Sequence, residues 1–145
     1  MVYKLRGRRN VGGQEVLVDP ANIGSANVVL TNVDCEASVY VGAAVVMNSS
    51  GVARNALADS LANSNVIGIV ESKSTSVLCN IRVIGATEAI FAGLDETLEY
   101  YLSDTVAGAI TTTIPITSGH VMLKLGQPLS ETRFVVLKGQ RVERA

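Results

Sequence analysis

Short runs of β-branched and other apolar residues, each ended by a turn rich in glycine, asparagine or proline, follow one another along most of this sequence. The turn signals recur about every 8–12 residues, which is the spacing found in β-sandwiches and closed barrels. A parallel sheet needs crossover helices, and the chain has no helical stretch of sufficient length. We therefore predict an all-β fold, either a small β-barrel or a β-sandwich of short antiparallel strands.

The strands can be placed from the apolar runs and their alternation. His120–Gln127 alternates most clearly, with Val121, Leu123 and Leu125 on one face. A polar turn is expected at Ser72–Thr75. The expected strands are Glu15–Val18, Ala26–Thr31, Val39–Met47, Val66–Glu71, Val77–Ile84, Glu88–Phe91, Thr97–Ser103, Ala109–Thr113, His120–Gln127 and Arg133–Lys138.

Two local features qualify this pattern. Gly42 lies inside an otherwise β-branched run and predicts a bulge or a close backbone approach. Asn55–Asn63 is the one helix-like stretch, with Leu57 and Leu61 four residues apart. It is so short that at most one short helix, of one or two turns, is expected.

Composition indicates one domain with an unusual core. The chain has 145 residues, of which 48% are hydrophobic and 17% charged, which excludes intrinsic disorder. Aromatic residues make up only 4%, and tryptophan is absent. Either the core consists of aliphatic layers or part of the apolar surface is buried against other subunits, and we expect both. We expect a single β domain over residues 14–145 and a symmetric homo-oligomer, with a trimer as the working assumption.

The first thirteen residues differ from the rest. Lys4, Arg6, Arg8 and Arg9 precede the first acidic residue, Glu15, although the whole chain has a formal net charge of −1. The segment lacks apolar periodicity and ends in a pair of glycines. Residues 1–13 are thus expected to form a basic N-terminal arm, either a frayed terminus or an extended arm that lies on a neighbouring subunit.

The residues that could bind a metal or cross a membrane are few. Cys35 and Cys79 are too far apart in the sequence for a zinc motif or a disulfide framework, and we expect two free, buried thiols, as in a reducing cytoplasm. No stretch approaches the ~20 apolar residues of a membrane helix. We expect no cofactor, no metal and no membrane partner.

Catalytic chemistry is not indicated. His120 is the single histidine, and it follows Ser118 at a turn without a nucleophile-elbow motif nearby. We expect it to be an exposed or half-buried turn residue. Asp95, Glu96 and Glu99 could pair as carboxylates, but a solvated loop is the simpler interpretation. The chain is therefore predicted not to be an enzyme.

Nucleic-acid binding is also not indicated. A single-strand binder combines a basic groove with stacking rings. Tyr100, Tyr101, Phe91 and Phe134 are few, and no basic run surrounds them. We expect no nucleic-acid partner.

The stretch from Val39 to Leu137 resembles a β-rich module of structural proteins from tailed bacteriophages, found in capsid decoration proteins and in tail appendages. Three pieces carry the resemblance: VYVGAAVVMNSSGVARNALADS followed by NVIGIVES, then YYLSDTVAGAITTTIPITSGHVMLKLGQPLS, and finally RFVVLK. The second piece is the most specific, because it specifies glycine, proline and serine positions over a long span.

The resemblance implies a virion structural protein, with a capsid decoration (cement) protein on the outer capsid surface as the first hypothesis. Such a protein would be assembled in the host bacterial cytoplasm, with the major capsid protein as its partner. The arm residues Lys4, Arg6, Arg8 and Arg9 would then contact acidic patches of the capsid. The first alternative is a tail-fibre or tail-knob component that contacts a host receptor through the loops Ser49–Ser64 and Asp104–Gly119. The second is a non-viral β-barrel domain that binds a small ligand in a concave pocket.

Overall fold

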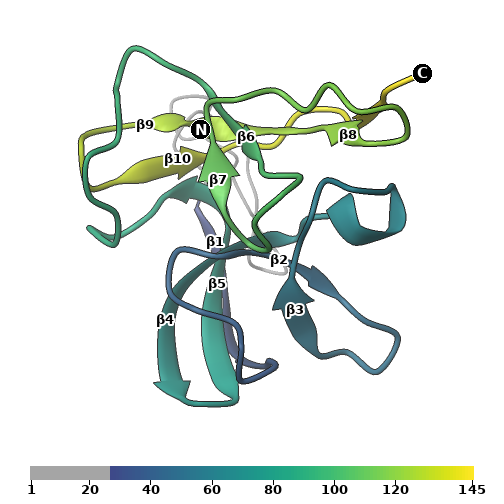
Figure 1. Ribbon diagram of the computed structural model, residues 1–145. Coiled ribbons are helices and arrows are strands. Elements are labelled where there is room, and N and C mark those ends of the chain that lie inside the picture. The colour runs from purple at the N-terminus through teal and green to yellow at the C-terminus, as the bar shows by residue number, and fades with distance from the viewer. Residues whose placement is uncertain (1–26) are drawn as a thin grey trace, which may run out of the picture.

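The structure, a computed structural model, describes residues 27–145, and within that range the chain forms eleven β-strands, one 3₁₀ turn and no α-helix (Figure 1). The all-β prediction is confirmed. The expected strand Glu15–Val18 and the expected basic arm, residues 1–13, lie outside the described residues. The strands are β1 (Val28–Asp34), β2 (Ala44–Met47), β3 (Ala53–Asn55), β4 (Gly68–Thr75), β5 (Leu78–Ala86), β6 (Tyr100–Leu102), β7 (Ile110–Thr111), β8 (Val121–Met122), β9 (Lys124–Pro128), β10 (Phe134–Val136) and β11 (Val142–Glu143), and the 3₁₀ turn is η1 (Ala62–Ser64).

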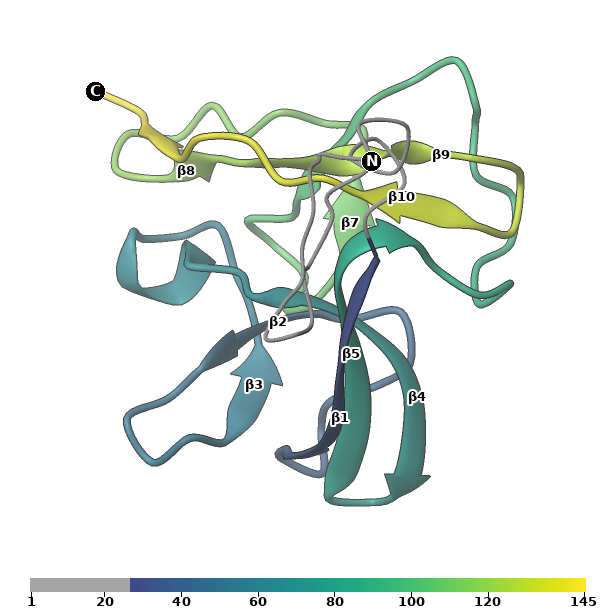
Figure 2. The same cartoon turned by 180° about the vertical axis from the view of Figure 1, so that it is seen from behind.

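Nine of these strands form one curled antiparallel sheet, a half-barrel, in which β5 is the pivot. The order is β3-β2-β4-β5-β10-β9-β6-β7, and β1 pairs with β5 outside this path. The first part of β5 pairs with β4 and β1, whereas Gly85 and Ala86 at its end pair with β10. Figures 1 and 2 show the result as two layers, with β1–β5 below and β6–β10 above. Separately, β8 pairs with β11.

Strands β2 and β4 lie between two hydrophobic cores. Ala44 and Ile69 face the first core, which they share with the upper layer, while Val45 and Val70 face the second core inside the curl of β1–β5. A strand buried on both faces requires a continuous apolar run instead of alternation. This requirement accounts for the run of small and β-branched residues before Met47.

The first core contains three aromatic rings, those of Phe91, Tyr100 and Phe134. The Phe134 ring is completely buried, with its centroid 5.9 Å from that of Tyr100 and 5.9 Å from that of Phe91. The predicted inward face of Val121, Leu123 and Leu125 joins them, since these residues are at most 1% exposed. The second core contains no ring among its buried residues and is wholly aliphatic apart from its two cysteines.

Several strand boundaries differ from the prediction. Ser72–Thr75 was expected to be a turn, but β4 continues through Thr75, which pairs with Leu78 across a turn at positions 76–77. The polar run is a strand end exposed to solvent, where the Asn80 amide donates to the Ser72 hydroxyl at 2.8 Å. Gly85 was expected to end β5. Instead it adopts a φ of +104°, and β5 continues to Ala86 alongside β10.

Other elements are shorter than expected or new. Glu88–Phe91 forms no strand, because its backbone turns toward the loop before β10, where the Phe91 N–H donates to the Thr132 carbonyl. The helix-like stretch Asn55–Asn63 contains turns that lead into η1. Strand β11 was not predicted. Gly42 does mark a close approach, with a φ of +94° and the Phe91 ring 3.3 Å from where a Cβ would lie.

Two glycines of the sheet leave no room for a side chain. A Cβ on Gly126 would lie 1.9 Å from the Val135 carbonyl oxygen, and one on Gly68 would lie 2.3 Å from that of Arg82. We predict that Gly126→Ala and Gly68→Ala each lower the free energy of unfolding by about 3 kcal/mol, because the backbone must move apart. Urea denaturation measures this change. Gly139→Ala is the matched control, since its nearest contact would be an ordinary 3.7 Å; equal stability of all three variants would contradict the prediction.

Candidate interaction surfaces

A buried ion pair joins β4 and β5 near the point where β5 leaves the lower layer. The Arg82 guanidinium donates through Nε to Glu71 Oε2 at 2.9 Å and through Nη2 to Oε1 at 3.1 Å. Their side chains are only 10% and 9% exposed. The sequence placed Arg82 on the face opposite Ile81, but its burial was not foreseen. Two planar groups that meet bidentately out of water form a rigid contact.

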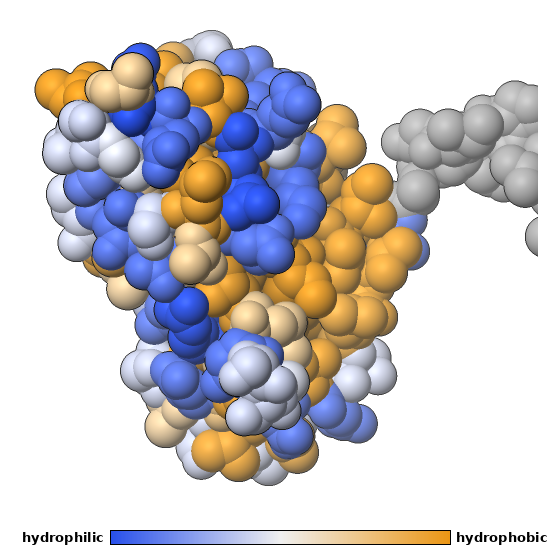
Figure 3. Space-filling model, turned by 90° about the vertical axis from the view of Figure 1, so that its right-hand side faces the viewer, coloured by the Kyte–Doolittle hydropathy of each residue, from blue (hydrophilic) through white to orange (hydrophobic). Residues whose placement is uncertain are grey.

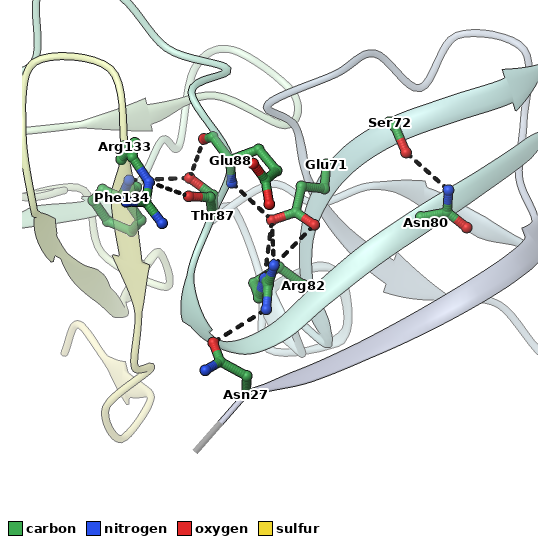
Figure 4. Close-up of polar contacts among 9 residues, drawn as sticks. All are labelled: Asn27, Glu71, Ser72, Asn80, Arg82, Thr87, Glu88, Arg133 and Phe134. Atoms are coloured by element: carbon green, nitrogen blue, oxygen red, sulfur yellow. Dashed lines mark hydrogen bonds and ion pairs between the residues drawn. The ribbon is translucent and has the colours of Figure 1, made fainter. Parts of the chain in front are cut away.

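The same pair also holds the chain on either side of the sheet (Figure 4). Glu71 Oε2 accepts the backbone N–H of Glu88 at 2.9 Å, and Arg82 Nη1 donates to the Asn27 side-chain oxygen at 3.1 Å. The ion pair therefore fixes the segment after β5 and the residue immediately before β1. Its oxygens and N–H groups are engaged within the fold, which is the arrangement of a structural contact.

Thr87 continues this junction to the upper layer. It is completely buried, its hydroxyl accepts the Phe134 N–H at 3.0 Å, and its own N–H donates to the Phe134 carbonyl at 2.8 Å. Arg133 Nε donates to the Thr87 carbonyl at 2.8 Å. Contacts from Glu71 to Phe134 thus form one polar path between the two layers (Figure 4).

The two thiols meet inside the second core. Cys35 and Cys79 are buried and free, as expected from the sequence. Burial, together with a hydrogen bond to Cys35, raises the pKa of the Cys79 thiol from 9.0 to about 12. The thiolate is the reactive form of cysteine, so Cys79 is chemically inert in the folded protein at neutral pH.

The remaining ionisable candidates serve local structure. His120 is half-buried, as predicted, and its Nδ1 lies 2.9 Å from the Asp104 carboxylate, which joins the turn before β7 to the start of β8. Hydrogen bonds from Thr97 lower the pKa of Asp95, and a hydrogen bond from Lys124 lowers that of Glu99. These two carboxylates have separate partners and do not act as a pair.

The loops that sequence reasoning assigned to receptor contact fall in different layers. Residues 49–64 begin in the turn that Asn48 and Val52 close and extend to η1 of the lower layer, whereas residues 104–119 cross the upper layer around β7. Lys4, Arg6, Arg8 and Arg9 lie outside the described residues, so their contacts stay a prediction.

One surface was missed by sequence reasoning: an apolar opening at the side of the half-barrel. It consists of partly exposed side chains packed against the second core, namely Leu30, Val33, Met47, Ile67 and Val83. Val28 and Val29, which are 44% and 36% exposed, continue it along β1. Figure 3 shows a broad hydrophobic area on this side of the molecule. The run VVL in β1 was a signal, but only the curl of the sheet shows that Leu30 and Met47 pack against the same core.

A hollow of about 480 Å³ lies elsewhere, lined by Gly93, Leu94, Asp95, Glu96, Thr97 and Glu131. It is acidic and contains none of the aromatic side chains that line most small-molecule sites. Among residues 27–145, no group of three or more histidine, cysteine or acidic side chains could hold a metal ion. Within the same range, no helix has the length and hydropathy needed to cross a membrane.

Comparisons with protein-family models, with curated proteins and with solved structures return no match. The surfaces must therefore be interpreted from their own chemistry. Within the described residues, Glu71, Arg82 and Thr87 at the junction have hydrogen-bond partners. The surface that no part of the described structure covers is the apolar opening.

The Glu71–Arg82 pair provides a direct test of what holds the two layers together. We predict that Glu71→Gln and Arg82→Met each lower the free energy of unfolding by about 3–5 kcal/mol, because one buried charge loses its partner. Chemical denaturation measures the loss. Lys124→Met, which breaks the exposed contact with Glu99 at 2.7 Å, is the control and should leave stability close to wild type. A wild-type value for Arg82→Met would contradict the assignment.

Cys79 makes stability depend on alkaline pH. The folded pKa of about 12 exceeds the ordinary value of 9.0, so the unfolded chain loses this proton first as the pH rises. We predict that this contribution to stability is constant below pH 9 and declines between pH 9 and pH 12. Urea titrations of the wild type and Cys79→Ala across this range measure the difference. An identical pH dependence in both proteins would contradict the prediction.

Proposed function

We propose that this chain is a structural protein of a tailed-phage virion, and specifically a decoration protein that binds the outer capsid shell and stabilises it. The observation that carries this proposal is the long motif YYLSDTVAGAITTTIPITSGHVMLKLGQPLS. In the fold it begins at β6 and runs through β9 around the first core. Gly108 and Gly119 within it have φ values of +79° and +82°, so the motif's glycines lie where turns need them.

The wider resemblance covers most of the fold. Val39–Leu137 includes β2 to β10, and therefore parts of both layers and most of both cores. A shared module can be placed at different virion positions by segments added at its ends. The part of this chain that precedes the resemblance includes β1 as well as the basic residues.

The proposed partner, the major capsid protein, is inferred from the basic residues that precede the module. Lys4, Arg6, Arg8 and Arg9 would bind acidic patches on the major capsid protein. Individually such contacts are weak, and many copies on a lattice would strengthen them through avidity. We further propose a homo-oligomer, with three copies as the working assumption, that buries apolar surface left exposed on one copy. The protein would act on the outer capsid surface, after assembly in the bacterial cytoplasm, and without catalysis.

Binding to undecorated capsids tests this function. We predict that the purified chain sediments with capsids in many copies, and that Ala substitution of Lys4, Arg6, Arg8 and Arg9 together weakens binding at least about tenfold, because the charge contacts are lost. Co-sedimentation at low and high salt measures it.

The matched control replaces Arg6, Arg8 and Arg9 by Lys and keeps the charge. Circular dichroism of each variant shows that the fold is retained. Binding of the wild type to host cells and not to capsids would overturn the decoration role in favour of a tail component. Binding to neither would remove both virion positions and leave a ligand-binding domain.

A further inference from the structure

The strands of the lower layer leave one side of their curl open. The chain just after β1 approaches β3, where Cys35 forms an isolated bridge with Ala53 and the Glu36 N–H donates to the Ala53 carbonyl at 2.9 Å. Within residues 27–145, β1 itself pairs only with β5. Among the described residues, the half-barrel is therefore closed at one end of β1, and no strand pairs with the other edge of β1 (Figure 2).

The side chains beside this edge are apolar, like those of a protein core. Leu30, Val33, Met47, Ile67 and Val83 pack against the second core yet stay partly exposed, which defines the apolar opening. A hollow of about 210 Å³ lies beside Met47 and Ile67. Its one ionisable lining residue is Lys138, whose ammonium group donates a hydrogen bond to the Val66 carbonyl. Exposed apolar surface next to a core favours a further covering element.

The edge of β1 offers the backbone partners for such an element. β1 has seven residues, and an edge strand leaves about half of its N–H and C=O groups unpaired. Its first residues, Val28, Val29 and Leu30, carry no charge that would discourage pairing. The irregularity at Asn32, with a φ of +53°, lies toward the other end. The free edge is thus most receptive where the opening lies.

The chain itself carries a segment suited to this place. Twenty-six residues precede the described part and join it at Asn27, directly before β1. Glu15–Val18 contains three apolar β-formers, and the turn signal Asp19-Pro20-Ala21-Asn22 follows it. A connection of nine residues spans up to about 30 Å when extended, which is ample to reverse the chain. The tether also gives the segment a high effective concentration near the edge.

We propose that Glu15–Val18 pairs antiparallel with the free edge of β1 in the same copy and covers the apolar opening. The basic residues Lys4, Arg6, Arg8 and Arg9 are less suited to an apolar surface, so the covering strand starts after the pair of glycines at 12 and 13. The arm would then leave the domain from a fixed point beside β1. This inference does not depend on the phage function.

Hydrogen exchange of the full-length chain, followed by mass spectrometry, tests the proposal. Amides of residues 15–18 and of β1 should exchange at least about tenfold more slowly than in an unstructured peptide. In a strand that covers a core, side chains alternate between the core and the solvent, so only every second position must be apolar. We therefore predict that one of two variants, Leu17→Lys or the double variant Val16→Lys/Val18→Lys, removes this protection, whereas the other retains it.

Controls separate docking from general unfolding. Val11→Lys, outside the proposed strand, should leave the protection at residues 15–18 intact. Val29→Lys, at the apolar edge of β1, should reduce it while residues 78–86 of β5 stay protected, which shows that the sheet is folded. Unprotected residues 15–18 in the wild type would overturn the proposal. Protection that rises with protein concentration, together with an oligomeric mass, would overturn docking in the same copy and place the segment on a second copy.

Discussion

The arrangement of this protein depends on the bidentate contact between Glu71 and Arg82. Two buried charges are costly unless each is fully paired, and here the carboxylate and guanidinium satisfy each other and also bind Glu88 and Asn27. The contact lies where β5 passes from one layer to the other. A hydrophobic pair could fill the same volume, but it could not accept the Glu88 N–H or donate to the Asn27 side chain. The ion pair therefore links the segment after β5 to the residue before β1.

That junction permits one short chain to build two cores. Strands β2 and β4 contribute side chains to both, so neither core can form without the other, and the layers are expected to fold as a single cooperative unit. This arrangement limits the size of the side chains that lie between the two cores. Ala43, Ala44 and Val45 are small or β-branched because they lie between two packed faces. The rings that take part in core packing, Phe91, Tyr100 and Phe134, all belong to the first core, and the second core is packed with aliphatic side chains and two cysteines.

Much of this fold could be predicted from the sequence. The alternation of Val121, Leu123 and Leu125 and the glycine at Gly42 are visible in the local sequence, and these features were correctly interpreted. The errors arise where tertiary contacts decide. Ser72 is polar like a turn residue, yet it pairs across a hairpin with Asn80, and the glycine at Gly85 bends a strand without ending it. The apolar opening could not be predicted, because its members come from four strands or loops that only the curl of the sheet brings together.

The distribution of polar and apolar groups also limits where function can lie. The buried polar groups around Arg82 and Thr87 converge on each other and hold the two layers together. Two candidate surfaces lie in the N-terminal part of the chain: the basic residues before Gly12 and the apolar edge at Val28. A segment that covers the apolar edge would also orient the basic arm, because only five residues separate Arg9 from Glu15 and nine separate Val18 from Val28. Stability of the half-barrel and presentation of the arm would thus depend on the same few residues, which couples folding of this domain to its attachment.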